Sequence, residues 1–162
     1  MACFLPGRTG VPKLDLAEHK SWQHYLATVL HMTTLLNREL LDAHQLSLAD
    51  LQLLDLLDTS PAGSVQMGEL PEALDSLPSR LTRQIKKLEE RGLVQRTLDP
   101  HDRRRVMATI TATGKTLLEQ TLITYTNAVR THFLGPLTRP QIAAMATTCR
   151  QIGDGLKGPG RP

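Results

Sequence analysis

The segment from Leu77 to Thr111 constrains the fold most strongly, because a helix pattern, a helix-ending glycine and a strand pattern follow one another in it. Pro78 suits the first turn of a helix, where its missing N–H has no helical partner. Apolar residues then recur at three- and four-residue steps across residues 81–88, and Gly92 is typical of the position just after a helix end. The runs LVQRTL and RVMATIT alternate as strands do, and DPHDRR joins them as a turn. The segment therefore predicts a helix followed directly by a β-hairpin.

Positive charge is concentrated in the same segment. Between Arg80 and Arg105, nine Lys or Arg residues stand against four Asp or Glu residues, a balance of +5 in a chain whose formal net charge is +3. The rest of the chain therefore carries −2. Basic charge gathered on one supersecondary unit is typical of a protein that binds a polyanion, although an ordinary solvated charge run has the same composition.

The rest of the chain has mostly helical patterns, so we expect a mainly α protein with a small β wing. The absence of Pro and Gly from Leu14 to Ala43, with apolar residues at helical steps, predicts one long amphipathic helix, and a helix of that length usually packs on a partner. Ser47 and Asp50 are placed to cap a second helix that stops near residue 59. Further helices are predicted over about 68–74 and 112–132, the latter capped by Thr111, and a capping box at 138–141 opens the last helix.

The length of 162 residues and the 40% hydrophobic content fit one domain, placed at residues 14–156. The Gly- and Pro-rich ends, 1–13 and 157–162, are expected to be disordered. No signal peptide, membrane-length apolar run or cysteine framework is found in the sequence, so a cytoplasmic protein is expected. No Gly-rich phosphate loop, HExxH or GxSxG motif is found either, and we expect neither an enzyme nor a cofactor.

The hairpin segment also carries a family resemblance. The run LEERGLVQRTLDPHDRRRVMATITATGK, preceded by PSRLTR, resembles the multiple-antibiotic-resistance regulator (MarR) family of winged helix-turn-helix transcription factors. The family hallmark is a DxR wing, then a strand ending in Leu/Ile-Thr and a helix opening with x-x-Gly. This chain offers Asp102-Arg103-Arg104, Ile110-Thr111 and Gly114. The resemblance covers about residues 14–156.

The resemblance implies a winged helix-turn-helix lobe at residues 47–111, flanked by long dimerisation helices at 14–44 and 112–156. It implies a homodimeric regulator, commonly a repressor, that binds a pseudo-palindromic site in double-stranded DNA. It also implies release by a small amphipathic or phenolic effector. A winged helix used only for protein contact is the alternative, but it would need an apolar or acidic face where the fourth helix is basic.

The predicted DNA contacts divide into base readers and phosphate contacts. The first turns of a helix that enters the major groove meet base edges, so the candidates there are Ser79, Arg80, Thr82, Arg83 and Gln84. Thr82 also neighbours the apolar stripe and could belong to the core. Lys86, Lys87 and Arg96 are better placed to meet phosphate. By resemblance, Asp102 orients Arg104, which enters the minor groove at the wing tip, while Arg103 and Arg105 contact phosphate. Leu77 stands where many members have Ser or Thr, so the recognition helix is expected to lack its usual cap unless Ser76 replaces it.

The sensing site is defined less sharply. Aromatic and amphipathic side chains line small-molecule sites, which makes Trp22, His24, Tyr25 and His44 the candidates, although packing explains the two aromatics nearly as well. Redox sensing would need Cys3, in the N-terminal tail, or Cys149, whose apolar stripe indicates a small buried hydrophobe. Zinc sensing would need the scattered helix histidines His19, His24, His31 and His44, which lack the spacing of a ligand cluster, so no metal is expected.

Overall fold

The computed structural model describes residues 13–99 and 101–156, and the ends expected to be disordered lie outside this range apart from Lys13. In chain order the elements are α1 (Leu16–His44), α2 (Leu48–Thr59), the 3₁₀ turn η1 (Pro61–Gly63), β1 (Ser64–Gln66), α3 (Leu70–Ala73), α4 (Pro78–Glu90), β2 (Val94–Leu98), β3 (Val106–Ile110), α5 (Ala112–Val129), the π-helical turn η2 (Arg130–Leu134) and α6 (Arg139–Leu156). The mainly helical fold with a small β wing is thereby confirmed.

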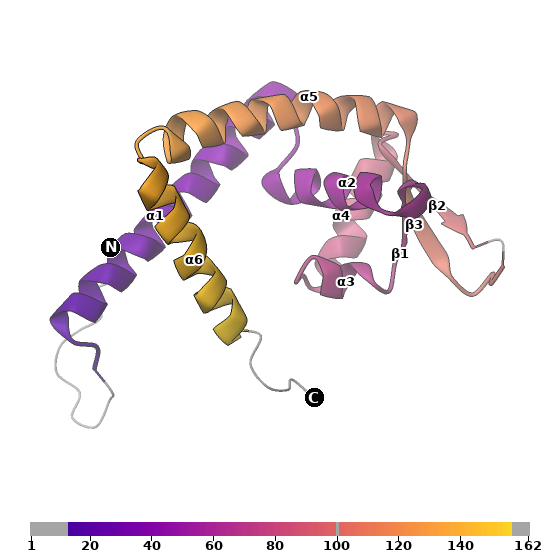
Figure 1. Cartoon of the computed structure of the whole chain (residues 1–162). Coiled ribbons are helices and arrows are strands. Elements are labelled where there is room, and N and C mark those ends of the chain that lie inside the picture. Colours follow the sequence, from indigo (N-terminus) through magenta and orange to yellow (C-terminus); the bar gives the residue numbers. More distant parts are fainter. Residues whose placement is uncertain (1–12, 100, 157–162) are drawn as a thin grey trace.

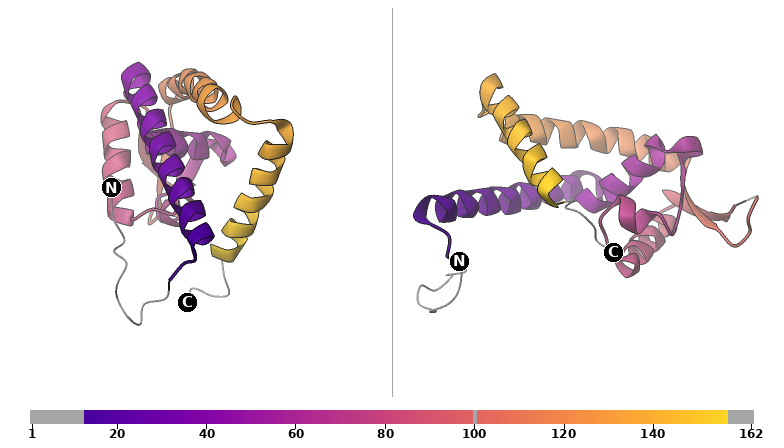
Figure 2. Two further views of the ribbon diagram at one scale, coloured as in Figure 1. Left: turned by 90° about the vertical axis from the view of Figure 1, so that its left-hand side faces the viewer. Right: turned by 60° about the horizontal axis from the view of Figure 1, so that its bottom comes forward.

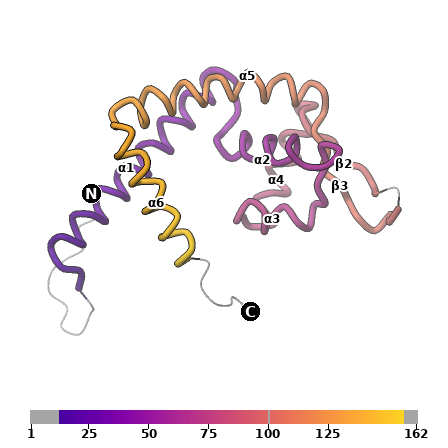
Figure 3. The backbone as a smooth tube through the Cα atoms, viewed as in Figure 1, coloured from indigo at the N-terminus to yellow at the C-terminus, as the bar shows by residue number. Residues whose placement is uncertain are grey.

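The molecule has a lobe at one end and two projecting helices at the other. Figure 1 shows α2, α3, α4 and the sheet grouped together, while α5 runs across the top and α1 and α6 extend away from the lobe. The tube in Figure 3 follows the same path, and the right-hand view of Figure 2 shows the β2–β3 hairpin projecting at the end opposite the start of α1. None of the described helices is long and apolar enough to cross a membrane.

The core lies inside the lobe and is built from leucine-rich helix faces. The buried sides of α2, α4, the sheet and the first part of α5 meet in this core, and the end of α1 packs against it. Its larger members include Leu40, Leu53, Leu54, Leu57, Leu70, Ile85, Leu88 and Leu118. The α4 stripe of Leu81, Ile85 and Leu88 is buried as the apolar spacing predicts.

The first helix buries only part of its predicted stripe. Leu36 and Leu40 are buried, whereas Leu26, Val29 and Leu30 are 39%, 41% and 57% exposed. The reason is geometric, because the N-terminal half of α1 extends beyond the lobe and has no core of its own chain to face (Figure 1).

The wing contains a third strand that the sequence did not predict. The sheet order is β1-β3-β2, and both pairings are antiparallel, with Ala108 opposite Val65 on one side and Arg96 on the other. The predicted hairpin is confirmed, but the connecting SVQM run supplies β1. The third helix is correspondingly shorter than predicted, Leu70–Ala73 rather than about 68–74.

The corner between the hairpin and α5 explains the spacing of the Thr and Gly in the family hallmark. Thr111 caps α5 by accepting the Gly114 N–H at 3.0 Å, and its hydroxyl donates to the Gly92 carbonyl at 2.7 Å. Gly92 itself has a φ of 70°, which favours glycine after the end of α4. A Cβ on Gly114 would collide with the Leu93 carbonyl oxygen, so the close approach of α5 to this turn requires glycine.

The two C-terminal elements differ slightly from expectation. The predicted helix over 112–132 is α-helical to Val129 and then widens into η2. At the start of α6, the Gln141 side-chain oxygen accepts both the backbone N–H and the hydroxyl of Thr138, at 2.8 and 2.9 Å. The predicted capping-box bond from the Thr138 backbone N–H to the Gln141 side chain is therefore present. The Thr138 hydroxyl donates to the same glutamine oxygen.

Candidate nucleic-acid interface

The exposed side of α4 carries the predicted base readers. Opposite its buried leucines and isoleucine, the helix exposes Ser79, Arg83 and Lys86, with Arg80 and Thr82 on the flanks. No ion pair among the described residues involves Arg80 or Arg83, so both guanidinium groups are available to a polyanion. As expected, neither Leu77 nor Ser76 caps the helix through a side chain.

Thr82 belongs to the exposed surface and not to the core. Its hydroxyl donates to the Pro78 carbonyl one turn earlier, at 2.9 Å, and the residue is exposed. A threonine bonded in this way still offers its oxygen lone pairs and its methyl group to a ligand.

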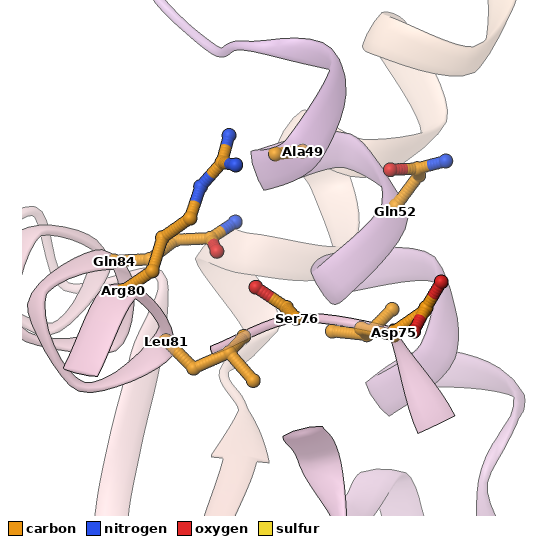
Figure 4. A pocket seen from close by; sticks show the side chains of 8 residues that line it. Ala49, Gln52, Asp75, Ser76, Arg80, Leu81 and Gln84 are labelled. Atoms are coloured by element: carbon orange, nitrogen blue, oxygen red, sulfur yellow. The ribbon is translucent and has the colours of Figure 1, made fainter. Parts of the chain in front are cut away.

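Gln84 points differently from the other predicted readers. It is half-buried, and its amide nitrogen is buried without a hydrogen-bond partner in the described part of the chain. Figure 4 shows Gln84 and Arg80 beside Ala49 of α2, at a small cavity of about 120 Å³ that Ser76 and Asp75 also line. This placement favours packing between α2 and α4 over reading of bases for Gln84.

Two of the predicted phosphate contacts already have acidic partners. The Lys87 ammonium lies 3.3 Å from a carboxylate oxygen of Asp50, which is buried at the start of α2. The Arg96 Nε donates to Glu89 Oε2 at 2.9 Å, joining β2 to α4. That side-chain hydrogen bond lowers the pKa of Glu89 and raises the pKa of Arg96. Lys86 is freer, since its exposed contact with Glu90 spans 3.9 Å.

The wing turn is organised by two carboxylates. Asp99 accepts the backbone N–H groups of His101 and Asp102, at 2.7 and 3.3 Å, and the His101 bond is the main reason that the pKa of Asp99 is lowered. Asp102 Oδ1 accepts the Arg104 N–H at 3.0 Å, while its Oδ2 lies 3.4 Å from Arg105 Nε.

Asp102 therefore acts on Arg104 through the backbone and forms its ion pair with Arg105, a division of roles that the sequence did not predict. The side chains of Arg103, Arg104 and Arg105 are all exposed. The turn residue Pro100 lies outside the described residues.

The four predicted effector residues do not come together within one chain. Trp22 and Tyr25 are neighbours on α1, with ring centroids 6.0 Å apart, and His24 is exposed beside them. His44 is at the other end of the same helix, roughly 33 Å away at 1.5 Å per residue, where its Nε2 is hydrogen-bonded to the Thr124 hydroxyl at 2.7 Å. A single pocket made of all four residues of one chain is excluded by the length of the helix.

The cysteine and histidine alternatives can be placed as well. Cys149 is exposed on α6, which corrects the expectation of a buried thiol: the apolar stripe of α6 does not face the core of its own chain. Cys3 lies outside the described residues. Within residues 13–99 and 101–156, no three His, Cys, Asp or Glu side chains are grouped closely enough to hold a metal ion.

Two contacts that hold α4 in place were not predicted from the sequence. Arg91, directly after α4, donates to the backbone carbonyls of His44 and Gln45 at the end of α1. Asp50 was predicted only as a cap, yet it also pairs with Lys87. Neither contact had a signal in the sequence, because each joins residues far apart in the chain.

The comparisons with known proteins agree with this geometry. Residues 46–106, which cover most of the lobe, match the MarR family. No curated protein matches the chain significantly. Among solved structures, the chain is similar to AbsC, a MarR family transcriptional regulator from Streptomyces coelicolor, with 26% identity, a TM-score of 0.84 and coverage of 92% of this chain and 100% of that one.

Two further structures bear on DNA binding and its control. Sco3205, a MarR family regulator from S. coelicolor determined in complex with DNA, is 28% identical with a TM-score of 0.83, over 89% of this chain and 94% of that one. Bordetella bronchiseptica BpsR, whose DNA binding is regulated by 6-hydroxynicotinic acid, is 21% identical with a TM-score of 0.71, over 89% and 99%. Residues 46–106, with their exposed basic recognition helix, therefore match the MarR family of DNA-binding winged helix-turn-helix transcriptional regulators, and the chain as a whole is similar to solved members of that family.

Proposed function

We propose that this regulator is a cytoplasmic homodimer that represses transcription by binding a pseudo-palindromic operator. Its half-sites lie about one helical turn apart, roughly 10 bp from centre to centre. A small amphipathic or phenolic molecule releases it from the DNA. The observation that carries the proposal is the exposed apolar surface of α1 and α6, at the end of the molecule away from the wing.

Large apolar side chains are exposed on both α1 and α6. Just before α1 and in its N-terminal half, the exposed large hydrophobic residues are Leu14, Leu16, Trp22, Tyr25, Leu26, Val29 and Leu30, and on α6 they are Ile152 and Leu156. Several large exposed apolar side chains on one helix are typical of an interface. A second copy of the chain is the natural occupant, with residues 14–44 and 112–156 as the dimerisation helices and 47–111 as the DNA-binding lobe.

The DNA-binding part of the proposal rests on free positive charge. Arg80 and Arg83 on α4 and Arg103 and Arg104 in the wing are exposed and have no acidic partner among the described side chains. Arginine in the first turns of a groove-entering helix can bind guanine bidentately, and arginine at a wing tip suits the narrow minor groove. The DNA complex of Sco3205 supports this use of the fold.

The effector part of the proposal separates the four candidate residues into two groups. His44 lies where α1 and α5 meet, next to the lobe, so a ligand there could change how the lobe is held. Trp22, His24 and Tyr25 lie on the exposed apolar end of α1 and would join an effector site only together with a second chain. BpsR, whose likeness to this chain is one of fold, offers a small hydroxylated aromatic acid as a first probe.

The decisive experiment combines light scattering with selection of duplexes from a random pool. We expect a dimer at micromolar concentration and a selected motif with two inverted halves. Leu30→Glu should yield monomers that lose the paired motif, whereas Leu77→Glu, an exposed leucine in the lobe, should leave the dimer intact. A parent protein that is monomeric and still binds one half-site specifically would refute the homodimer. Titrating 6-hydroxynicotinic acid and related phenolic acids into the complex then tests release.

A further inference from the structure

We propose that Arg91 is a positioning residue for DNA binding, which locks the connection between α1 and α2 and so fixes the recognition helix relative to the dimerisation helix. The inference rests on the dimeric DNA-binding function proposed above and adds a residue that sets the spacing between the two half-sites.

Arg91 joins the ends of two helices. It is the residue directly after α4, and its guanidinium reaches the C-terminal end of α1. Its Nη1 donates to the Gln45 carbonyl at 2.7 Å, and its Nη2 donates to the His44 carbonyl at 3.2 Å. The last carbonyls of a helix lack helical partners and form the negative end of its dipole, so a cation with two donors is well matched to them.

The backbone at this point needs such support. Gln45 ends α1 in the left-handed conformation, with φ 57° and ψ 29°. A residue with a Cβ disfavours this region, and such a conformation persists where the surroundings determine it. Arg91 donates to the carbonyl of this very residue, so it helps to hold the direction in which the chain leaves α1.

Other contacts hold the same connection, but from different elements. Leu46 is fully buried in the lobe core. The Leu48 N–H donates to the Asn37 side-chain oxygen at 2.9 Å, which ties the start of α2 back to α1. His44 is hydrogen-bonded to Thr124 of α5. These contacts fix α1, α2 and α5 to one another, and the Asp50–Lys87 contact joins α2 to α4. The contacts of Arg91 add a direct link between the end of the recognition helix and the end of α1.

A specific consequence follows for a dimer. In each copy, the Arg91 contacts contribute, beside the shared core, to the position of the recognition helix relative to α1, and so to the distance between the two recognition helices. Without Arg91, each lobe keeps its own core and its own base readers, so a half-site is still read. The angle between lobe and dimerisation helix becomes less defined, and the dimer tolerates operators with altered spacing.

The test measures spacing preference and not only affinity. The selected half-sites are placed in duplexes whose centre-to-centre distance is the preferred one or is changed by one or two base pairs, and the affinities of the parent, Arg91→Ala, Arg91→Lys and Lys86→Ala proteins are compared. We expect Arg91→Ala to reduce the preference for the best spacing by roughly five- to tenfold, the size of a typical coupling between sites. Arg91→Lys keeps the charge but not the planar fork, so it should lose part of the preference. Lys86→Ala, the matched loss of one exposed charge on the same helix, should weaken all duplexes alike.

The outcomes separate the competing explanations. A folded Arg91→Ala protein that keeps the parent's spacing preference overturns the proposal. If that variant keeps the spacing preference and its DNA affinity depends less steeply on salt concentration than the parent's, Arg91 is a phosphate contact instead. If Arg91→Ala does not fold, an Arg91→Lys protein with the full parental preference overturns the proposal equally. A parent protein that itself shows no spacing preference would refute the proposed dimeric function, before any variant is compared.

Discussion

Asp50 and Lys87 tie the first helix of the lobe to the recognition helix. A carboxylate oxygen of Asp50 lies 3.3 Å from the Lys87 ammonium, and Asp50 is only 2% exposed. The same carboxylate accepts the Ser47 N–H at 2.9 Å, so it both caps α2 and holds α4. A lysine that compensates a buried carboxylate has a structural role, and this competes with the phosphate contact predicted for it.

Replacing Lys87 should therefore affect folding more than DNA binding. Lys87→Ala leaves Asp50 buried without its cation, and we expect the free energy of unfolding to fall by about 1 kcal/mol, since the lysine itself is half-exposed. The salt slope of DNA binding should change little. Urea unfolding and binding at two salt concentrations measure both quantities.

Lys86→Ala is the matched control on the same helix. Its contact with Glu90 is long and exposed, so stability should stay within about 0.5 kcal/mol of the parent, while the salt slope should fall by about one per lost phosphate contact. If Lys87→Ala instead lowers the salt slope and leaves stability unchanged, Lys87 is a phosphate contact after all.

Arg83 should carry sequence information. It is exposed opposite the buried face of α4 and has no ion-pair partner among the described residues. Arg83→Ala should cost about 1 to 3 kcal/mol on the best site and relax the preference at one position of each half-site. Selection of duplexes with the variant checks this, and a selected motif identical to the parent's would remove Arg83 from the readout.

The contact between Glu89 and Arg96 should make stability depend on pH. The Arg96 hydrogen bond lowers the pKa of Glu89 below its ordinary value of 4.5. A pKa lowered in the folded state means that the bond stabilises the protein above the unfolded pKa and is lost as the pH falls through the folded one. Glu89→Gln should be less stable than the parent at pH 7, and the difference should shrink towards zero as the pH falls below 4.5. Thermal melts between pH 3 and about 8 measure it, and a difference that is constant across that range would contradict the prediction.

The parts of the fold that the sequence predicted depend on local signals. Pro78 and Gly92 mark the ends of α4 within a few residues of the helix itself, and Thr111 caps α5 as expected. The strand β1 was missed because three residues are too few to show alternation, and its partner β3 is far away in the sequence.

The candidate site was predicted less completely, since its geometry depends on tertiary contacts. The pairing of Asp50 with Lys87 has no local pattern. The predicted effector group placed His44 with Trp22, although they lie 22 residues apart on one helix, roughly 33 Å at 1.5 Å per residue. Cys149 was expected to be buried because an apolar stripe was taken to face the core, whereas α6 leaves the core of its own chain.

The wing offers the sharpest test of how this protein reads DNA. Arg104→Ala should weaken specific binding substantially and leave dimerisation and thermal stability nearly unchanged, because an exposed loop arginine contributes little to folding. Asp102→Ala should weaken binding too, although it removes a negative charge from a DNA-facing turn and simple electrostatics predicts the opposite. The reason is that Asp102 accepts the Arg104 N–H and so holds the turn in which Arg104 is presented.

Asp102→Asn separates geometry from charge at this position. Its amide oxygen can still accept the Arg104 N–H, but its ion pair with Arg105 is lost. If the turn geometry matters, Asp102→Asn should bind nearly as well as the parent while Asp102→Ala binds more weakly at both low and high salt. If charge alone matters, both variants should bind more tightly than the parent, by an amount that shrinks as salt is added. Affinities of the three proteins at two salt concentrations decide the matter, because the two explanations predict opposite signs for Asp102→Ala.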